Sequence, residues 1–301
     1  MSKVAYIIDY ISKKNPVHTK KLRKTLNNLG ADYDRRAHEF LTRYETILSE
    51  GGQTLDFAID SYLQMLTDIT VETLRFRETG EYSSKSFEEV NQRVYGNPEV
   101  MEYYMHGLLL SQFLWKHHFE MFGFFTMELS RRRDSIHNYL EIGGGHGLQV
   151  AEAARILAPT AHVTVVDISP TSLDLARRMV GNASVAFILS DVFLYQPPEK
   201  FDFITIGEVL EHLENPSALL QRAADLLKEN GTLFITTPAN APTIDHIYLF
   251  RNAEDIRRLI RDAGLTVETE FLRYAEDVDV EIAEKYKITL LYGACLKKRP
   301  K

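Results

Sequence analysis

A glycine-rich turn and two later aspartates are the residues of this 301-residue chain whose spacing points most directly to chemistry. Residues 143–147 read Gly-Gly-Gly-His-Gly, and glycine lets a backbone turn sharply and approach a ligand closely. Asp167 follows Gly143 near the offset, roughly 20 positions, at which a carboxylate accepts hydrogen bonds from ribose hydroxyls. Asp191 could accept from an adenine amino group while Val192 packs on the ring. Each aspartate alone could be a turn or helix cap, but together they predict a nucleoside site.

A second group of polar residues combines carboxylates with imidazoles. Glu208, Glu211 and His212 lie close together in sequence, and His246 lies further along. Histidine is the side chain most often used as a general base. We therefore expect His212 or His246 to be catalytic, as a base that removes a proton from an acceptor.

The elements that must position these residues alternate between strands and helices from residue 138 onward. We expect strands at 138–142, 162–166, 185–189, 201–206 and 231–236, helices at 148–157, 170–180, 216–228 and 253–263, and closing strands at 266–274 and 287–297. Strands that alternate with helices predict an α/β fold, a doubly wound parallel sheet with helices on both faces.

The N-terminal part of the chain, residues 1–135, follows a helical pattern instead. Residues 17–49 and 54–77 have apolar side chains at helical spacing, and Asn97 followed by Pro98 predicts a helix start. Residues 99–129 are rich in aromatic side chains, which indicates burial on several sides, as core and dimer contact or as a wall of a substrate pocket. We expect His106, His117 and His118 to be helix residues whose polar atoms have partners, and His146 to face solvent or to cap a helix.

Composition limits the partners that the chain can have. The net charge is −7, which argues against a nucleic-acid partner because phosphate neutralisation needs lysine and arginine. No apolar stretch has the roughly 18 to 20 residues that a membrane span needs, and we expect neither a signal peptide nor membrane association. A single cysteine, Cys295, suits a reducing cytosol, so we expect a cytoplasmic protein.

From residue 139 to the C-terminus the chain resembles the class I S-adenosylmethionine-dependent methyltransferases, with a Rossmann-like sheet. Residues 141–147 resemble their first motif, residues 207–212 the motif after strand four, and residues 226–238 the stretch around strand five. The resemblance implies a seven-stranded sheet whose last strand is antiparallel, with S-adenosylmethionine as cofactor. The residues that it implies at the cofactor are Glu141, Gly143, Gly145, Gly147, Asp167, Ile168, Asp191, Val192 and Glu208.

The resemblance does not extend to the N-terminal part of the chain. By analogy with small-molecule methyltransferases, we expect residues 1–135 to form a helical dimerisation and substrate-lid domain, and residues 136–301 to form the methyltransferase domain. The predicted assembly is a homodimer through the N-terminal helices.

The second polar group is similar to a pattern in ubiquinone-pathway O-methyltransferases and in small-RNA 2′-O-methyltransferases. In those enzymes two carboxylates and two imidazoles can hold a divalent metal beside the methyl donor. The resemblance implies metal ligands at Glu208, Glu211, His212 and His246. Oxygen and imidazole donors suit Mg²⁺, Mn²⁺, Fe²⁺ or Zn²⁺, and a bound metal lowers the pKa of a substrate hydroxyl. A metal-free base at His212 or His246 is the alternative.

The predicted function is methyl transfer to an oxygen of a small, mainly apolar or aromatic molecule. N- or C-methylation of a natural product, RNA 2′-O-methylation, a nicotinamide-dependent oxidoreductase and a catalytically silent binding protein are the alternatives. No Asn-Pro-Pro-Tyr-type motif follows the fourth strand, which argues against methylation of adenine N6 or glutamine.

Overall fold

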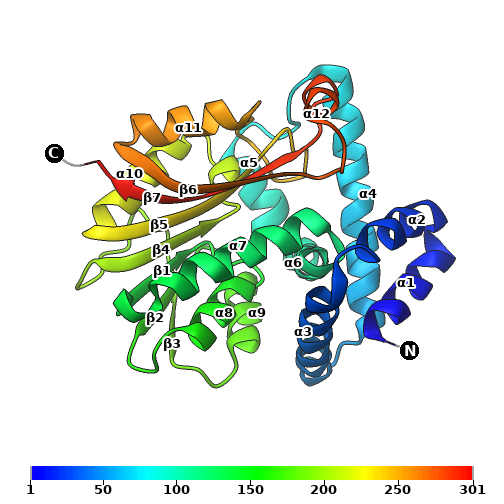
Figure 1. Cartoon of the computed structure of the whole chain (residues 1–301), viewed down its shortest axis with the longest axis horizontal. Coiled ribbons are helices and arrows are strands. Elements are labelled where there is room, and N and C mark those ends of the chain that lie inside the picture. The colour runs from blue at the N-terminus through cyan, green and yellow to red at the C-terminus, as the bar shows by residue number, and fades with distance from the viewer. Residues whose placement is uncertain (1, 300–301) are drawn as a thin grey trace.

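A seven-stranded sheet forms the centre of the computed structural model, which describes residues 2–299 (Figure 1). Its strand order is β3-β2-β1-β4-β5-β7-β6. The strands are β1 (Asn138–Ile142), β2 (His162–Asp167), β3 (Val185–Leu189), β4 (Phe201–Gly207), β5 (Leu227–Ala239), β6 (Leu265–Tyr274) and β7 (Leu290–Lys298). Strand β7 runs antiparallel to β5 and β6, and the other neighbours are parallel. The predicted seven-stranded sheet with an antiparallel last strand is therefore confirmed.

The order of the parallel strands reverses beside β1, which pairs with β2 on one side and β4 on the other. In a sheet of this kind the connections that lead to the two sides of the first strand pass over opposite faces of the sheet. A crevice therefore opens between them, at the carboxyl ends of the strands. The loops after β1, β2 and β4 therefore share one edge, and they carry the predicted site residues.

Helices cover both faces of the sheet because successive strand residues point to opposite sides. Tyr139 belongs to the core beneath α7 (Lys116–Arg132), α8 (Leu148–Ile156) and α9 (Pro170–Val180). Leu140 belongs to the core beneath α10 (Pro216–Leu226) and α11 (Ala253–Asp262). Figure 1 shows these two layers of helices on either side of the strands.

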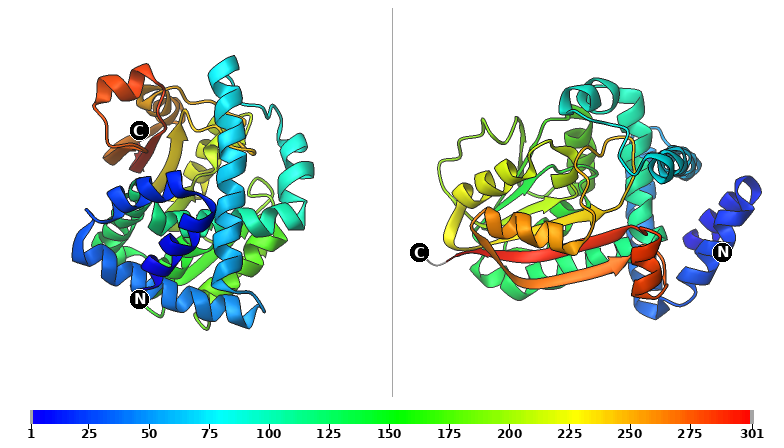
Figure 2. Two further views of the ribbon diagram at one scale, coloured as in Figure 1. Left: turned by 90° about the vertical axis from the view of Figure 1, so that its right-hand side faces the viewer. Right: turned by 90° about the horizontal axis from the view of Figure 1, so that it is seen from above.

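The N-terminal helices stand beside the sheet, and Figure 2 shows them at the end of the molecule opposite to the one where the last strand, β7, ends. They are α1 (Lys3–Lys14), α2 (Pro16–Leu26), α3 (Gly30–Glu50), α4 (Leu55–Thr79), α5 (Phe87–Val90), the π-helix η1 (Asn91–Tyr95) and α6 (Pro98–Leu114). The single helical stretch expected over 17–49 is two helices, because the chain turns at 27–29 before Gly30. Asn97 caps α6 by accepting from the amides of Glu99 and Val100, as predicted.

The aromatic stretch at 99–129 is likewise two helices, α6 and α7, which meet at Trp115. Trp115 has extended backbone, and its indole N–H donates to the Tyr62 hydroxyl at 2.7 Å. Two histidines of this stretch have polar partners, as expected: buried His106 contacts the Tyr44 hydroxyl, and half-buried His118 contacts the Ser111 hydroxyl. His117 is buried against the rings of Trp115 and His118.

One hydrophobic core contains residues of the N-terminal helices, of α7 and of the sheet, and α7 makes the contacts with the strands. Phe124 and Phe125 of α7 both contact Phe234 of β5, with ring centroids 5.8 and 5.2 Å apart. Gly293 of β7 leaves room for Met121, since a Cβ there would lie 2.4 Å from the methionine sulfur. Cys295, further along β7, is fully buried beside Glu128 of α7. The domain boundary near residue 135 stays a prediction, and the core runs across it.

Short elements complete the fold. They are the 3-10 helices η2 (Arg133–Ser135) and η3 (Leu210–His212), and helix α12 (Val280–Lys285). Among the helices within residues 2–299, none has both the length and the apolar character needed to span a bilayer.

Candidate active site

The glycine turn lies between β1 and α8 and needs glycine for two separate reasons. The φ angles are +75° at Gly143, +49° at Gly145 and +78° at Gly147, values that residues with a side chain rarely adopt. At Gly147 a Cβ would also lie 2.4 Å from the Cα of Ala176 in α9. At Gly145 a Cβ would meet no atom of residues 2–299 within 4 Å. The turn is therefore packed tightly against α9 on one side and open at Gly145.

Asp167 ends β2 directly beside this turn. Its carboxylate accepts from the amide of Gly145 at 3.2 Å and from the amide of Ser169 at 2.7 Å. Burial raises the pKa of Asp167, and these backbone amides act in the opposite direction. The structure thus brings the predicted ribose carboxylate onto the predicted glycine turn.

Apolar side chains are exposed on the other side of Asp167. Ile168 is 40% exposed and Phe193 is 41% exposed, whereas Val192 is buried. Asp191 is exposed, and its carboxylate accepts from the amide of Phe193 at 2.9 Å. An open apolar surface beside two aspartates suits the face of a planar, nitrogen-containing ring.

Glu141 and Glu208, two further predicted cofactor residues, both have buried carboxylate oxygens. Glu141 is buried within β1, where it accepts from the Tyr139 hydroxyl at 2.9 Å, and burial raises its pKa to about 8. Glu208 has a positive φ of 54°, and no donor in the described part of the chain reaches its buried oxygen Oε1. Burial raises the pKa of Glu208 to about 7. Strained backbone with an unpaired buried carboxylate is typical of functional sites.

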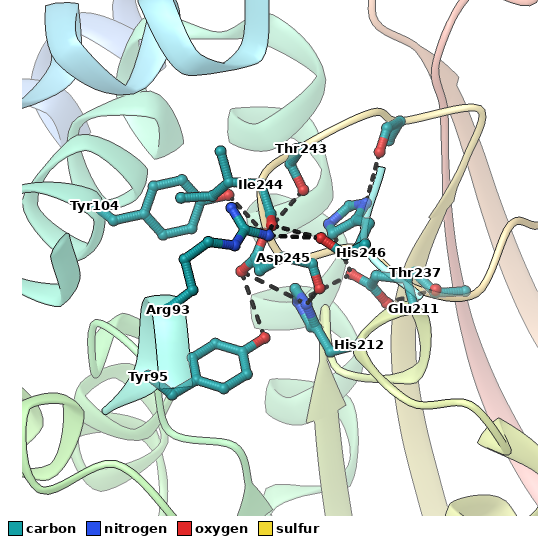
Figure 3. Close-up of polar contacts among 12 residues, drawn as sticks. Arg93, Tyr95, Tyr104, Glu211, His212, Thr237, Thr243, Ile244, Asp245 and His246 are labelled. Carbon is teal, nitrogen blue, oxygen red and sulfur yellow. Dashed lines mark hydrogen bonds and ion pairs between the residues drawn. The ribbon is translucent and has the colours of Figure 1, made fainter. Parts of the chain in front are cut away.

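Three side chains of types that can bind a metal meet just beyond Glu208. Oxygen Oε1 of Glu211, in η3, lies 3.8 Å from Nε2 of His212 and 3.8 Å from Nε2 of His246 (Figure 3). Ligand atoms of all three residues lie within 4.8 Å of one another. Glu208, the fourth ligand implied by the resemblance, lies outside this group, although its charge still raises the pKa of Glu211.

The remaining polar atoms of the three residues are held by protein partners. Oε2 of Glu211 accepts from the Thr237 hydroxyl at 2.7 Å. Nδ1 of His212 lies 3.1 Å from the carbonyl of Asp245, and Nδ1 of His246 lies 2.6 Å from the carbonyl of Ala241. A carbonyl can only accept, so each Nδ1 carries a proton, and in the corresponding neutral tautomer each Nε2 presents a lone pair.

Two lone pairs therefore face a carboxylate oxygen that no donor from residues 2–299 satisfies. Burial lowers the pKa of His246 to about 3, which keeps this imidazole neutral. Burial, and then the charge of Glu208, raises the pKa of Glu211 well above its ordinary value. Three electron-pair donors that face one another suit a divalent cation of the type that imidazole and carboxylate bind together.

Several residues at the site come from the N-terminal region, and most of them carry no recognisable sequence signal. Figure 3 shows Arg93, Tyr95 and Tyr104 pointing toward the loop that carries Asp245 and His246. The ring of Tyr95 lies edge-on to His212, with centroids 6.0 Å apart. Tyr104 belongs to the aromatic stretch already suspected of lining a pocket, but no local pattern marks Arg93 or Tyr95.

Comparison with known proteins agrees with this geometry. Residues 114–270 match a family model described as a methyltransferase domain. The chain belongs to this methyltransferase family. As a member of the family it is an S-adenosylmethionine-dependent enzyme, which decides against the nicotinamide alternative. The match begins within α6, before the boundary expected near residue 135.

The similar curated methyltransferases include two named for ubiquinone biosynthesis. The ubiquinone biosynthesis O-methyltransferase of Glaesserella parasuis is 32% identical over 158 residues, 48% of this chain and 65% of that protein. The mitochondrial enzyme of Schizosaccharomyces pombe is 29% identical over 178 residues, 57% of this chain and 63% of that protein. The chain thus spans less than two thirds of the length of these methyltransferases.

A solved methyltransferase shares the fold over a longer stretch. The structure of mitomycin 7-O-methyltransferase MmcR superposes with a TM-score of 0.53 at 14% identity, covering 77% of this chain and 68% of that one. At this identity the likeness supports the fold of the methyltransferase and nothing finer.

Proposed function

We propose that the enzyme transfers a methyl group from S-adenosylmethionine to a hydroxyl oxygen of a small, apolar or aromatic molecule, with a divalent metal held by Glu211, His212 and His246. The observation that carries this proposal is the convergence of Glu211 Oε1 with two imidazole lone pairs beside the glycine turn. The names of the similar ubiquinone O-methyltransferases support oxygen as the acceptor atom.

The donor would lie across the carboxyl ends of β1 and β2. The open side of the turn at Gly145 leaves space for its methionine part, and Asp167 would accept from the ribose hydroxyls. Ile168 and Phe193 would cover the adenine, with Asp191 near its amino group. The turn and these side chains fix the donor, so that catalysis depends on alignment with the acceptor.

In the reaction, a lone pair of the acceptor oxygen forms a bond to the methyl carbon while the carbon–sulfur bond breaks and its electrons return to sulfur. The acceptor proton must leave, and a cation bound by Glu211, His212 and His246 would supply the Lewis acidity that lowers the pKa of the hydroxyl. Without a cation, Nε2 of His212 or His246 has the lone pair that a general base needs.

Calorimetric titration with S-adenosylhomocysteine tests donor binding, and the chain offers a matched control. Asp167 and Asp202 each accept from two backbone amides, but Asp202 binds His137 and Asn138 at the opposite edge of the sheet. We expect Asp167→Asn to weaken binding at least about tenfold and Asp202→Asn to leave it within about twofold. Equal effects of the two variants would contradict the proposed donor site.

Methyl-transfer assays with a panel of aromatic hydroxy compounds, amines and short RNAs test the acceptor. We expect transfer to hydroxyl compounds that falls on chelation, returns with Mg²⁺, Mn²⁺, Fe²⁺ or Zn²⁺, and is lost in Glu211→Ala. Full activity after chelation and in Glu211→Ala would leave the metal-free base as the mechanism.

A homodimer through the N-terminal helices and a cytoplasmic location also stay predictions. Leu74 and Val71 are exposed on α4, which supports a contact there. Light scattering of the full chain, with Leu74→Lys as the variant expected to dissociate a dimer, measures this directly.

A further inference from the structure

The loop at 240–247, which carries Asp245 and His246, is held in place by the N-terminal region. We call residues 82–104 the cap segment. The Tyr82 hydroxyl accepts from the amide of Ala241 at 2.9 Å. Ser84 and Arg93 both donate to the carbonyl of Ile244, at 2.9 and 2.6 Å. These partners lie 151 to 160 residues apart in sequence, so the cap segment supplies tertiary contacts that help to hold the loop.

Asp245 receives hydrogen bonds from the same segment. It is 2% exposed, and its Oδ1 accepts from the Tyr104 hydroxyl at 2.9 Å and from the Thr243 hydroxyl at 2.8 Å. Its Oδ2 lies 3.5 Å from the Tyr95 hydroxyl. Figure 3 shows these donors arranged around the carboxylate. A buried carboxylate with this many donors has a fixed position.

The other neighbour of Asp245 is His212. Nδ1 of His212 lies 3.1 Å from the Asp245 carbonyl and 3.5 Å from its Oδ2. The Asp245 carbonyl accepts from Nδ1 and so fixes the ring orientation, and the carboxylate adds negative charge behind the imidazole, which makes the opposite nitrogen a stronger electron donor. Asp245 thus connects the tyrosines of the cap segment to the face of His212 that points away from Glu211.

We propose, on the basis of the metal-assisted function proposed above, that Asp245 is a positioning residue for His212 and that Tyr104 couples the cap segment to the metal site. The site then binds its cation tightly only while the cap segment is seated on the loop. Coupling of binding free energies is reciprocal, so the cation in turn stabilises the seated cap segment.

Titration of the full chain with Co²⁺, followed by calorimetry and by the visible absorption of the bound ion, tests the coupling without any activity measurement. We expect Asp245→Asn to lose about tenfold or more in Co²⁺ affinity, as for other residues behind a metal ligand. Tyr104→Phe should lose about fivefold, the equivalent of one ordinary hydrogen bond. Both should also shift the absorption bands of the bound ion.

Tyr103→Phe is the matched control, because the neighbouring hydroxyl donates to Asp68 of α4 and not to the loop. It should change Co²⁺ affinity less than about twofold. Hydrogen–deuterium exchange gives the reciprocal readout: saturating Co²⁺ should slow exchange in residues 82–104 of the native chain, and less so in Tyr104→Phe. If Asp245→Asn fails to fold, Tyr104→Phe alone decides.

Unchanged Co²⁺ affinity in the variants that fold would overturn the coupling, and so would a native chain that binds no Co²⁺. S-adenosylhomocysteine binding separates these failures from failure of the methyl-transfer function. Tyr104→Phe should keep the donor affinity of the native chain, whereas loss of donor binding in the native chain would count against the proposed function instead.

Discussion

Glu211 is fully buried, and no hydrogen-bond donor among residues 2–299 reaches its Oε1. Glutamine reproduces the shape of the neutral acid and can donate to the lone pairs of His212 and His246. We therefore expect metal-free Glu211→Gln to be at least as stable as the native chain, because it removes an unpaired buried carboxylate.

The same substitution should abolish stabilisation by metal. At a metal concentration about 100 times the Kd, the native chain should gain about 2.7 kcal/mol in free energy of unfolding, and Glu211→Gln should gain nothing. Thermal unfolding with and without Mn²⁺ measures both effects. A variant that metal stabilises as well as the native chain would remove Glu211 from the site.

Substitutions at two glycines of the turn should have different effects on stability and on donor binding. Gly147→Ala combines a positive φ with a Cβ 2.4 Å from Ala176, so it should cost about 3 kcal/mol of stability. Gly145→Ala places its Cβ clear of every described atom and should cost only about 1 kcal/mol, for its left-handed backbone.

Donor affinity should nevertheless fall in Gly145→Ala, since its methyl group would enter the space proposed for S-adenosylmethionine. Denaturant unfolding combined with calorimetric titration of the same samples makes the comparison. Gly145→Ala with native donor affinity would show that the open side of the turn is not the donor site.

At the scale of elements, helix α6 places His106 between α3 and α4, against Tyr44 and Phe57. Burial lowers the pKa of His106 to about 4. The pKa of histidine in the unfolded chain is near 6.5. Between about pH 4 and pH 6.5 the unfolded chain therefore binds a proton at His106 that the folded chain does not bind. His106 therefore destabilises the fold as pH falls from about 6.5 to about 4.

We expect His106→Gln to reduce the acid sensitivity of unfolding by about 1.4 kcal/mol per pH unit in that window. Glutamine keeps a polar partner for Tyr44, so the variant should fold. Urea unfolding at several pH values measures the difference in slope, which cancels the contributions of the buried acids common to both chains. Parallel curves would contradict a neutral, buried His106.

Most elements of the sheet half could be predicted closely, because their boundaries have local causes. The exception lies between α10 and β5, where the helix expected to reach 228 ends at 226 and the strand expected from 231 begins at 227. Ser169 before Pro170 and Asn215 before Pro216 mark helix starts, and the structure begins α9 and α10 there. Breaks that depend on tertiary packing could not be predicted. The stretch at 99–129 has no glycine or proline at Trp115, and the chain turns there because the indole bonds to Tyr62 on α4.

The candidate site likewise contains some residues that the sequence indicates and others that only tertiary packing brings in. Glu211 and His212 are adjacent in sequence, and the loop after β5 brings His246 to them as the resemblance implied. The contacts of Tyr82, Arg93 and Tyr104 join segments that lie far apart along the chain, and nothing local in the sequence indicates such pairings.

At the scale of the whole molecule, the N-terminal helices and the sheet share one hydrophobic core, with Phe125 packed on Phe234 and Met121 on Gly293. Separate domains would unfold separately, whereas a shared core favours a single transition. We expect one calorimetric transition. The fluorescence of Trp115, the chain's only tryptophan, should change together with far-ultraviolet circular dichroism.

Gly293→Val gives a directed test of this shared core, because its side chain would displace Met121. It should lower the single transition temperature as a whole and not split it. Two resolved transitions, or a fluorescence change at a temperature apart from the dichroism change, would show that the helical region folds independently.

The burial of Cys295 has a practical consequence for following the cap segment in motion. The thiolate is the reactive form of cysteine, and burial raises the pKa of this one native thiol to about 12. A maleimide dye should therefore leave the native chain unlabelled and attach only to cysteines introduced on the surface. Placing one at exposed Lys85 and another at Asp134 would show by energy transfer whether the cap segment moves, with no background position to remove first.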